Sequence, residues 1–134
     1  MKEARSGYVL VAEDDDAIAR LLRTALSEDG IEVRVAHTGH AALALVEEAP
    51  PTLVLLDLRL PGLPGASLGL TLHSRWPNLP LVVLSAMSLQ AVAEDARMMG
   101  AAAYFTKPFE LEDVLQCVAS LLVAADAQLA CDER

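Results

Sequence analysis

Short apolar runs alternate with longer segments of helical period along this chain, and the alternation repeats five times. Most of the runs are rich in Val, Leu and Ala without polar interruption, which is typical of strands buried on both faces of a parallel sheet. The predicted strands are residues 8–12, 32–36, 53–56, 81–84 and 103–106. The pattern therefore predicts a repeated strand-helix unit.

The segments between the runs carry apolar residues at the spacing of amphipathic helices. In the first of them, Asp15 or Asp16 can cap the start and Gly30 can end the helix. Gly69 and several Ser and Thr residues lower the helix propensity of the third. The predicted helices are residues 16–29, 39–48, 66–75, 89–96 and 110 toward 129.

A chain that alternates strands and helices in this way forms a parallel sheet with right-handed crossovers, which place helices on both faces. We predict an α/β, flavodoxin-like (βα)5 fold, doubly wound, with five parallel strands in the order 2-1-3-4-5. At 134 residues the chain suits one domain, 1–134, with a core over about 7–124. Residues 125–134 are either a helix extension and tail or the start of a linker.

The composition narrows the class of protein. The formal net charge of -9 would repel a nucleic-acid backbone, so we expect no direct nucleic-acid binding by this chain. The first residues lack the apolar stretch of a signal peptide, and no run reaches the ~18 apolar residues of a membrane span. We expect a cytoplasmic protein in which Cys117 and Cys131 are reduced thiols.

Polar side chains follow four of the predicted strands: Glu13 and Asp14, Asp57, Ser85, and Lys107. Taken singly, each has a structural explanation, such as acidic residues that complement a helix dipole. However, the carboxyl ends of parallel strands meet at one edge of the sheet, so these groups should converge. Asp57 would be costly to bury there without a cation or hydrogen bonds.

The converging groups predict phosphoryl transfer. Two like charges about 4 Å apart repel by ~4 kcal/mol at an effective dielectric of ~20, so three carboxylates raise a pKa or recruit a cation. Mg²⁺ prefers oxygen ligands, and Mn²⁺ is a substitute. With Lys107 and Mg²⁺ the site is nearly neutral and can accept a phosphoryl group. Ser85 and Lys107 supply the donors its oxygens need, and a carboxylate such as Asp57 can attack phosphorus.

Four motifs occur in a fixed order along the chain: VLVAEDD from Val9, LLDLRLPG from Leu55 with Gly65 beyond it, VLSA from Val83, and YFTKPF from Tyr104. Together they resemble the receiver domain of two-component response regulators, over about residues 7–124. The resemblance implies a phosphorylated signalling protein that is not an enzyme, apart from its own phosphorylation and dephosphorylation.

The resemblance also implies roles for the strand-end residues. Asp57 would take a phosphoryl group from the phosphohistidine of a sensor histidine kinase or a histidine phosphotransfer protein. Glu13 and Asp14 would hold Mg²⁺ directly or through water, with Asp57 and the backbone carbonyl of Arg59 completing the protein ligands. Lys107 would contact the phosphoryl oxygens, and the Lys107-Pro108 peptide would be cis.

Further positions follow from the same resemblance. Ser85 would contact the phosphoryl group, Ala86 would leave room beside it, and Tyr104 would turn inward on activation. This would alter the face made by the fourth helix, fifth strand and fifth helix. Arg59 and Met87 would flank the pocket, and we hypothesise that they set how readily water attacks the acyl phosphate. The output is a partner protein, an effector domain beyond this sequence, or a phosphorylation-dependent homodimer.

Two other functions compete with this interpretation. A haloacid-dehalogenase-type phosphohydrolase also uses an aspartyl phosphate, but its Asp-x-Asp-x-Thr motif is not matched by residues 13–17. A pseudo-receiver, which is an interaction module that never takes phosphate, has the same predicted fold. The three His residues lack ligand spacing, and we interpret Met87, Met98 and Met99 as packing residues. Gly62 and Gly65 are interpreted as loop residues rather than a phosphate cradle.

Overall fold

The computed structural model describes residues 7–132, with side chains placed for residues 7–124. Five strands alternate with five helices. The strands are β1 (Val9–Ala12), β2 (Val33–Ala36), β3 (Leu53–Asp57), β4 (Leu81–Ser85) and β5 (Ala103–Thr106). The helices are α1 (Asp16–Glu28), α2 (Gly39–Glu48), α3 (Gly65–Arg75), α4 (Leu89–Met98) and α5 (Leu111–Asp132).

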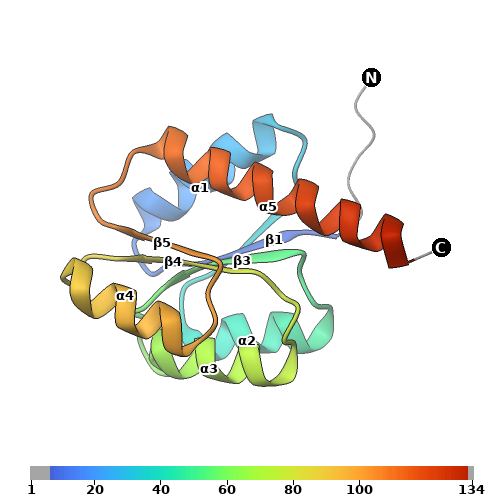
Figure 1. Cartoon of the computed structure of the whole chain (residues 1–134). Helices are drawn as coiled ribbons and strands as arrows, with labels where there is room; N and C mark the ends of the chain where they lie inside the picture. Colours follow the sequence, from blue (N-terminus) through green and yellow to red (C-terminus); the bar gives the residue numbers. More distant parts are fainter. Residues whose placement is uncertain (1–6, 133–134) are drawn as a thin grey trace.

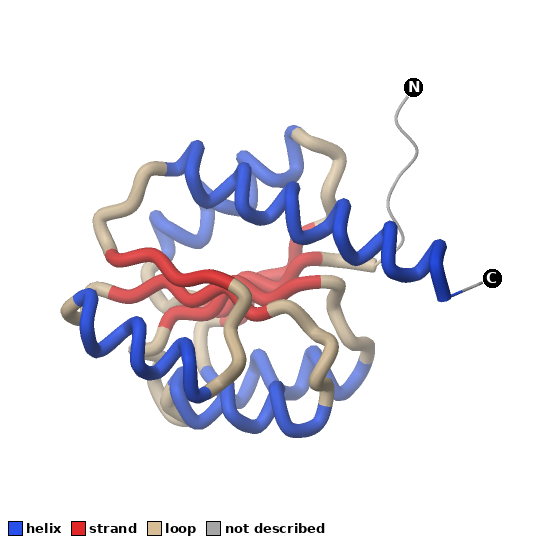
Figure 2. Tube along the Cα trace, in the orientation of Figure 1, coloured by secondary structure: helices blue, strands red, loops and turns tan. Residues whose placement is uncertain are grey.

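All neighbouring strands pair in parallel, in the order β2-β1-β3-β4-β5. Helices α1 and α5 cover one face of the sheet, and α2, α3 and α4 cover the other (Figures 1 and 2). This arrangement confirms the predicted doubly wound fold and its strand order. The carboxyl ends of all five strands therefore lie at one edge.

The core divides into two clusters because successive side chains on a strand point to opposite faces. In β3, Val54 and Leu56 pack with the α2, α3 and α4 side, whereas Leu53 and Leu55 pack with the α1 and α5 side. All four are buried. A strand covered on both faces has no polar positions, which explains the uninterrupted apolar runs in the sequence.

The element boundaries differ from the predicted ones by a few residues. β3 and β4 each extend one residue further than predicted, so that Asp57 and Ser85 belong to the strands themselves. Asp15 is the N-cap of α1, where its side chain accepts hydrogen bonds from Ala17 N and Ile18 N. Tyr8 lies before β1 rather than in it, and its buried hydroxyl donates to carbonyl oxygens of α2 and its C-cap.

Helix α5 continues to Asp132, beyond the predicted end near residue 129. Of the helices within the described residues, none has the length and apolar character needed to cross a membrane. Cys117, on α5, is a free, half-buried thiol. The side chain of Cys131 falls outside the described side chains.

Candidate functional site

Three carboxylates predicted from strand ends meet at the carboxyl edge of the sheet. Glu13 and Asp14 follow β1, and Asp57 is the last residue of β3, which pairs directly with β1. One oxygen from each of the three lies within 4.8 Å of the others. Glu13 and Asp57 are buried, while Asp14 is exposed. The cluster thus has a buried interior and one side open to solvent.

Lys107 joins the two buried carboxylates. Its ammonium donates hydrogen bonds to Glu13 Oε1 at 2.5 Å and to Asp57 Oδ2 at 3.2 Å. The backbone N–H of Lys107 donates to the Ser85 carbonyl at 2.7 Å, which ties the end of β5 to the end of β4. Three carboxylates and one ammonium leave the cluster net negative, so the arrangement has room for further positive charge.

The buried charges shift two pKa values. Burial raises the pKa of Glu13 from its ordinary 4.5 to about 7; the hydrogen bond from Lys107 opposes the rise, and the nearby Asp57 adds to it. Burial alone would lower the pKa of Lys107, but its hydrogen bond to Glu13 and the charge of Asp57 raise it. The cluster therefore favours both the charged lysine and a bound proton or cation near Glu13.

The donor set suits a hard divalent cation. Oxygen atoms of Glu13, Asp14 and Asp57 face one another, and carboxylate oxygens are the ligands that Mg²⁺ prefers. The backbone N–H of Arg59 donates to Asp57 Oδ1 at 3.0 Å, so the loop after β3 folds back against the same carboxylate. The side chain of Arg59 is exposed. The residues present fit a magnesium ion.

Ser85 lies at the end of β4 with no exposed surface. Its hydroxyl oxygen accepts a hydrogen bond from Met87 N at 3.2 Å. Ala86 is exposed and Met87 is half-buried, so the turn after β4 opens beside the cluster. The hydroxyl that sequence analysis singled out is therefore buried, while the two residues after it border solvent.

Tyr104 lies on the edge strand β5 and is 42% exposed. It pairs with Val83, two residues before Ser85 on β4, and Ser85 pairs with Thr106. Paired residues of parallel strands point to the same face, and Val83 belongs to the core cluster on the α4 side. Tyr104 and Ser85 therefore share the face toward α4, but the tyrosine ring is not part of the charged cluster.

Other sequence predictions have clear outcomes. The Lys107-Pro108 peptide is cis, as the resemblance implied. Met99 is buried, but Met98 is 59% exposed, so interpreting Met98 as a packing residue was wrong. It is the last residue of α4.

One residue beside the cluster, His37, was not predicted from the sequence to lie there. His37 Nδ1 lies 3.0 Å from the backbone carbonyl oxygen of Glu13, within hydrogen-bonding distance. The ring is exposed and follows Ala36, the last residue of β2. The rule that directed attention to the other strand ends, namely a polar group directly after a strand, would have found it.

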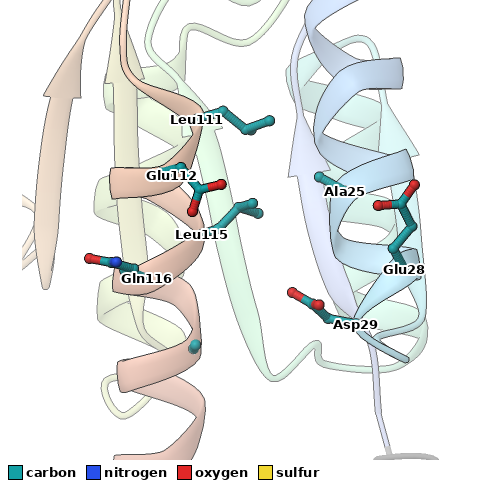
Figure 3. A pocket seen from close by; sticks show the side chains of 8 residues that line it. Ala25, Glu28, Asp29, Leu111, Glu112, Leu115 and Gln116 are labelled. Atoms are coloured by element: carbon teal, nitrogen blue, oxygen red, sulfur yellow. The ribbon is translucent and has the colours of Figure 1, made fainter.

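A separate hollow of about 440 Å³ lies between α1 and α5 (Figure 3). Glu28 and Asp29 line it from the end of α1, and Leu111, Glu112 and Leu115 line it from α5. None of the predicted site residues lines this hollow. The charged cluster is thus a different feature of the molecule.

Comparison with known proteins agrees with this geometry. Residues 9–119 match the family model described as the response regulator receiver domain. YkoG of Bacillus subtilis, described as an uncharacterized transcriptional regulatory protein, is 34% identical over 116 residues, covering 87% of this chain and 51% of YkoG. Response regulator MprA of Mycobacterium avium is 35% identical over 114 residues, 85% of this chain and 50% of MprA. The chain spans about half the length of these curated relatives.

Among solved structures, the receiver domain of the Francisella response regulator 1452 superposes with a TM-score of 0.83. It is 33% identical in sequence, and the match covers 90% of this chain and 99% of that one.

Proposed function

Because this chain belongs to the response regulator receiver domain family, we propose that it is a signalling receiver that accepts a phosphoryl group on Asp57. The donor would be the phosphohistidine of a sensor histidine kinase or of a histidine phosphotransfer protein. The proposal covers residues 1–134 as one receiver domain. The observation that carries it is the buried Asp57 at the end of β3, facing Lys107 and two further carboxylates.

In the proposed reaction, a carboxylate oxygen of Asp57 attacks the phosphorus atom. The new O–P bond forms as the P–N bond of the phosphohistidine breaks, and its electron pair returns to the imidazole ring. Lys107 and Ser85 would donate hydrogen bonds to the phosphoryl oxygens, where charge must be stabilised. Mg²⁺, held by Glu13, Asp14, Asp57 and the Arg59 carbonyl, would neutralise the remaining negative charge.

The proposal is tested by the intact mass of the protein after incubation with acetyl phosphate and Mg²⁺. We expect a gain of one phosphoryl group in the wild type, and none with Asp57→Asn or with EDTA. Asp113→Asn is the matched control, because Asp113 is an exposed aspartate on α5 and its variant should gain the group normally.

A wild type that neither gains mass nor binds Mg²⁺ would favour the pseudo-receiver instead. Sustained release of phosphate from diverse phosphomonoesters would favour a phosphohydrolase. A gain of mass that survives in Asp57→Asn would assign the acceptor to another residue.

We propose that Arg59 and Met87 flank the route by which water would approach Asp57 and so control the lifetime of the phosphorylated state. The Arg59 side chain is exposed, and its backbone N–H donates a hydrogen bond to the Asp57 carboxylate. We expect Arg59→Asn to change the autodephosphorylation rate, measured as loss of the added mass after donor removal. An unchanged rate would remove the Arg59 side chain from this role.

A further inference from the structure

The loop between β3 and α3, residues 58–64, carries the Arg59 backbone that folds against Asp57. Two of its side chains, Leu58 and Leu60, are buried in the core. Any proposed metal ligand on this loop depends on where the loop backbone lies. The contacts that fix the loop are therefore relevant to the site, although several lie outside the charged cluster.

One end of the loop is fixed by Gly65, the first residue of α3. Its backbone N–H donates to the Leu58 carbonyl at 3.1 Å. A Cβ atom at Gly65 would lie 2.3 Å from the Asp57 carbonyl oxygen and 2.4 Å from Leu58 Cα, so a side chain cannot be added without displacing backbone. This end of the loop is held directly beside the phosphoacceptor strand.

The other end is held by α2, which is distant in sequence. The backbone N–H of Gly39, the first residue of α2, donates to the Pro61 carbonyl at 3.3 Å. This carbonyl satisfies one of the N–H groups that a helix start leaves without an intrahelical partner. Beside it, a Cβ atom built on Gly62 would lie 3.1 Å from the ring of His40. The start of α2 thus lies beside residues 61–63 of the loop.

Space, rather than backbone conformation, requires glycine at position 39. Gly39 is not among the residues with positive φ. A Cβ atom there would lie 2.1 Å from the Leu63 carbonyl oxygen and 2.7 Å from Leu63 Cβ. Helix α2 is anchored by Ala42 and Val46, both with no exposed surface. In the loop, Pro61 and Gly62 are exposed and Leu63 is half-buried, so a side chain at Gly39 would displace this part of the loop more readily than the helix.

We propose that Gly39 is a positioning residue for the metal site, assisted by His40. By allowing α2 to approach the loop, Gly39 sets where the Arg59 backbone lies relative to Asp57. This inference rests on the proposed Mg²⁺ site. Mg²⁺ requires nearly ideal octahedral geometry, whereas Ca²⁺ tolerates irregular geometry and longer bonds. A displaced loop should therefore weaken Mg²⁺ binding more than Ca²⁺ binding.

The test is calorimetric titration of the whole chain with MgCl₂ and, separately, with CaCl₂. For Gly39→Ala we expect the Kd for Mg²⁺ to rise 10- to 100-fold, the usual range for residues that support metal ligands. The Kd for Ca²⁺ should rise less. A general loss of stability would instead raise the Kd values for Mg²⁺ and Ca²⁺ by similar factors. Thermal unfolding in EDTA checks that each variant is folded.

Gly30→Ala is the matched control. Gly30 has φ +80 and nothing lies within 4 Å of a Cβ atom built there, so alanine strains the backbone without touching the loop. Its unfolding temperature should fall while both Kd values stay as in the wild type. His40→Ala, at an exposed position, provides a second test that does not depend on Gly39→Ala folding. It should raise the Kd for Mg²⁺ by a smaller factor than Gly39→Ala.

The outcomes separate the two proposals. A wild type that binds no Mg²⁺ overturns the proposed function and this inference with it. Suppose instead that the wild type binds Mg²⁺ and that folded Gly39→Ala has the wild-type Kd for Mg²⁺ and for Ca²⁺. That result overturns the positioning role of Gly39 alone. If Gly39→Ala does not fold, an unchanged Kd for Mg²⁺ in His40→Ala overturns it.

Discussion

At the scale of single residues, the central feature is a lysine shared by two buried carboxylates. Lys107 is 14% exposed at its side chain, and Glu13 and Asp57 are 1% and 5% exposed. Burial of unlike charges stabilises a protein only when each is paired, and here two negative charges compete for one positive charge. Burial is the main cause of the raised pKa of Glu13, and the nearby Asp57 adds to the rise while the hydrogen bond from Lys107 opposes it.

The raised Glu13 pKa predicts a pH dependence of stability without metal. The folded protein holds a proton on Glu13 up to about pH 7, whereas the unfolded chain releases it near 4.5. The resulting stabilisation is complete below pH 4.5 and is lost as pH rises through 7. In EDTA, the free energy of unfolding should therefore fall between pH 4.5 and 7.5 by more in the wild type than in Glu13→Gln.

Urea unfolding across this pH range measures the difference. Glu94→Gln, an exposed change on α4, should keep the wild-type slope. Saturating Mg²⁺ should abolish this fall, because a bound cation keeps the Glu13 carboxylate charged in the folded protein, as it already is in the unfolded chain over most of this range. If the free energy of unfolding in EDTA changes equally with pH in the wild type and in Glu13→Gln, then burial does not raise the pKa of Glu13 as we infer.

At the scale of elements, β4 and β5 connect the charged cluster to an exposed edge of the sheet. The bond between Lys107 N and the Ser85 carbonyl joins the strand ends, and Tyr104 and Ser85 share the face toward α4. A phosphoryl group acts at a distance only by favouring one of two arrangements of such an element. We infer that Ser85 moves toward the phosphoryl group and that the Tyr104 ring enters the space it leaves.

Fluorotyrosine NMR tests this movement. The chain has two tyrosines, and Tyr8 is a natural reference because it is buried and its hydroxyl donates to Leu45 and Ala49 carbonyls. On phosphorylation, we expect the ¹⁹F resonance of Tyr104 to shift and that of Tyr8 to stay. Complete switching from 1:99 to 99:1 needs about 5.5 kcal/mol of differential stabilisation.

Ser85→Ala provides the control for this experiment. The variant should still gain phosphoryl mass on Asp57, but its Tyr104 resonance should shift less. If Tyr104 in the wild type is unchanged while mass spectrometry shows full phosphorylation, the output does not pass through this residue.

At the scale of the whole molecule, the net charge bears on nucleic-acid binding, and the length relative to known relatives bears on how a signal is passed on. The net charge of -9 opposes contact with nucleic acid. The chain spans about half the length of its curated relatives YkoG and MprA. We propose that the output belongs to an effector domain in a longer protein or to a separate partner, with phosphorylation-dependent dimerisation as a further route.

The net charge of -9 predicts that this chain does not bind duplex DNA. Non-specific binders reach Kd values of about 10⁻⁴ to 10⁻⁶ M through phosphate contacts. Fluorescence anisotropy of a labelled duplex at low salt should show no complex at protein concentrations up to about 100 μM. The phosphorylated chain should behave in the same way. Salt-dependent binding in the micromolar range would show that a local basic surface outweighs the net charge.

The sequence alone determined the fold class, the strand order and the strand-end residues that meet at the site. This was possible because strands buried on both faces must be continuously apolar. The first polar residue after each apolar run can therefore be identified in the sequence. The four polar strand ends chosen in this way include Asp57, Ser85 and Lys107, which the structure brings to one edge.

Only the tertiary structure decided which of these groups touch and which residues support them. The pairing of Lys107 with Glu13 spans 94 positions, and no local pattern encodes it. Two further contacts also depend on how closely separate elements approach one another. These are the hydrogen bond between His37 and the Glu13 carbonyl and the close packing of Gly39 against Leu63. Local periodicity fixes which face a residue takes, but distances between backbones are set by packing of the whole core.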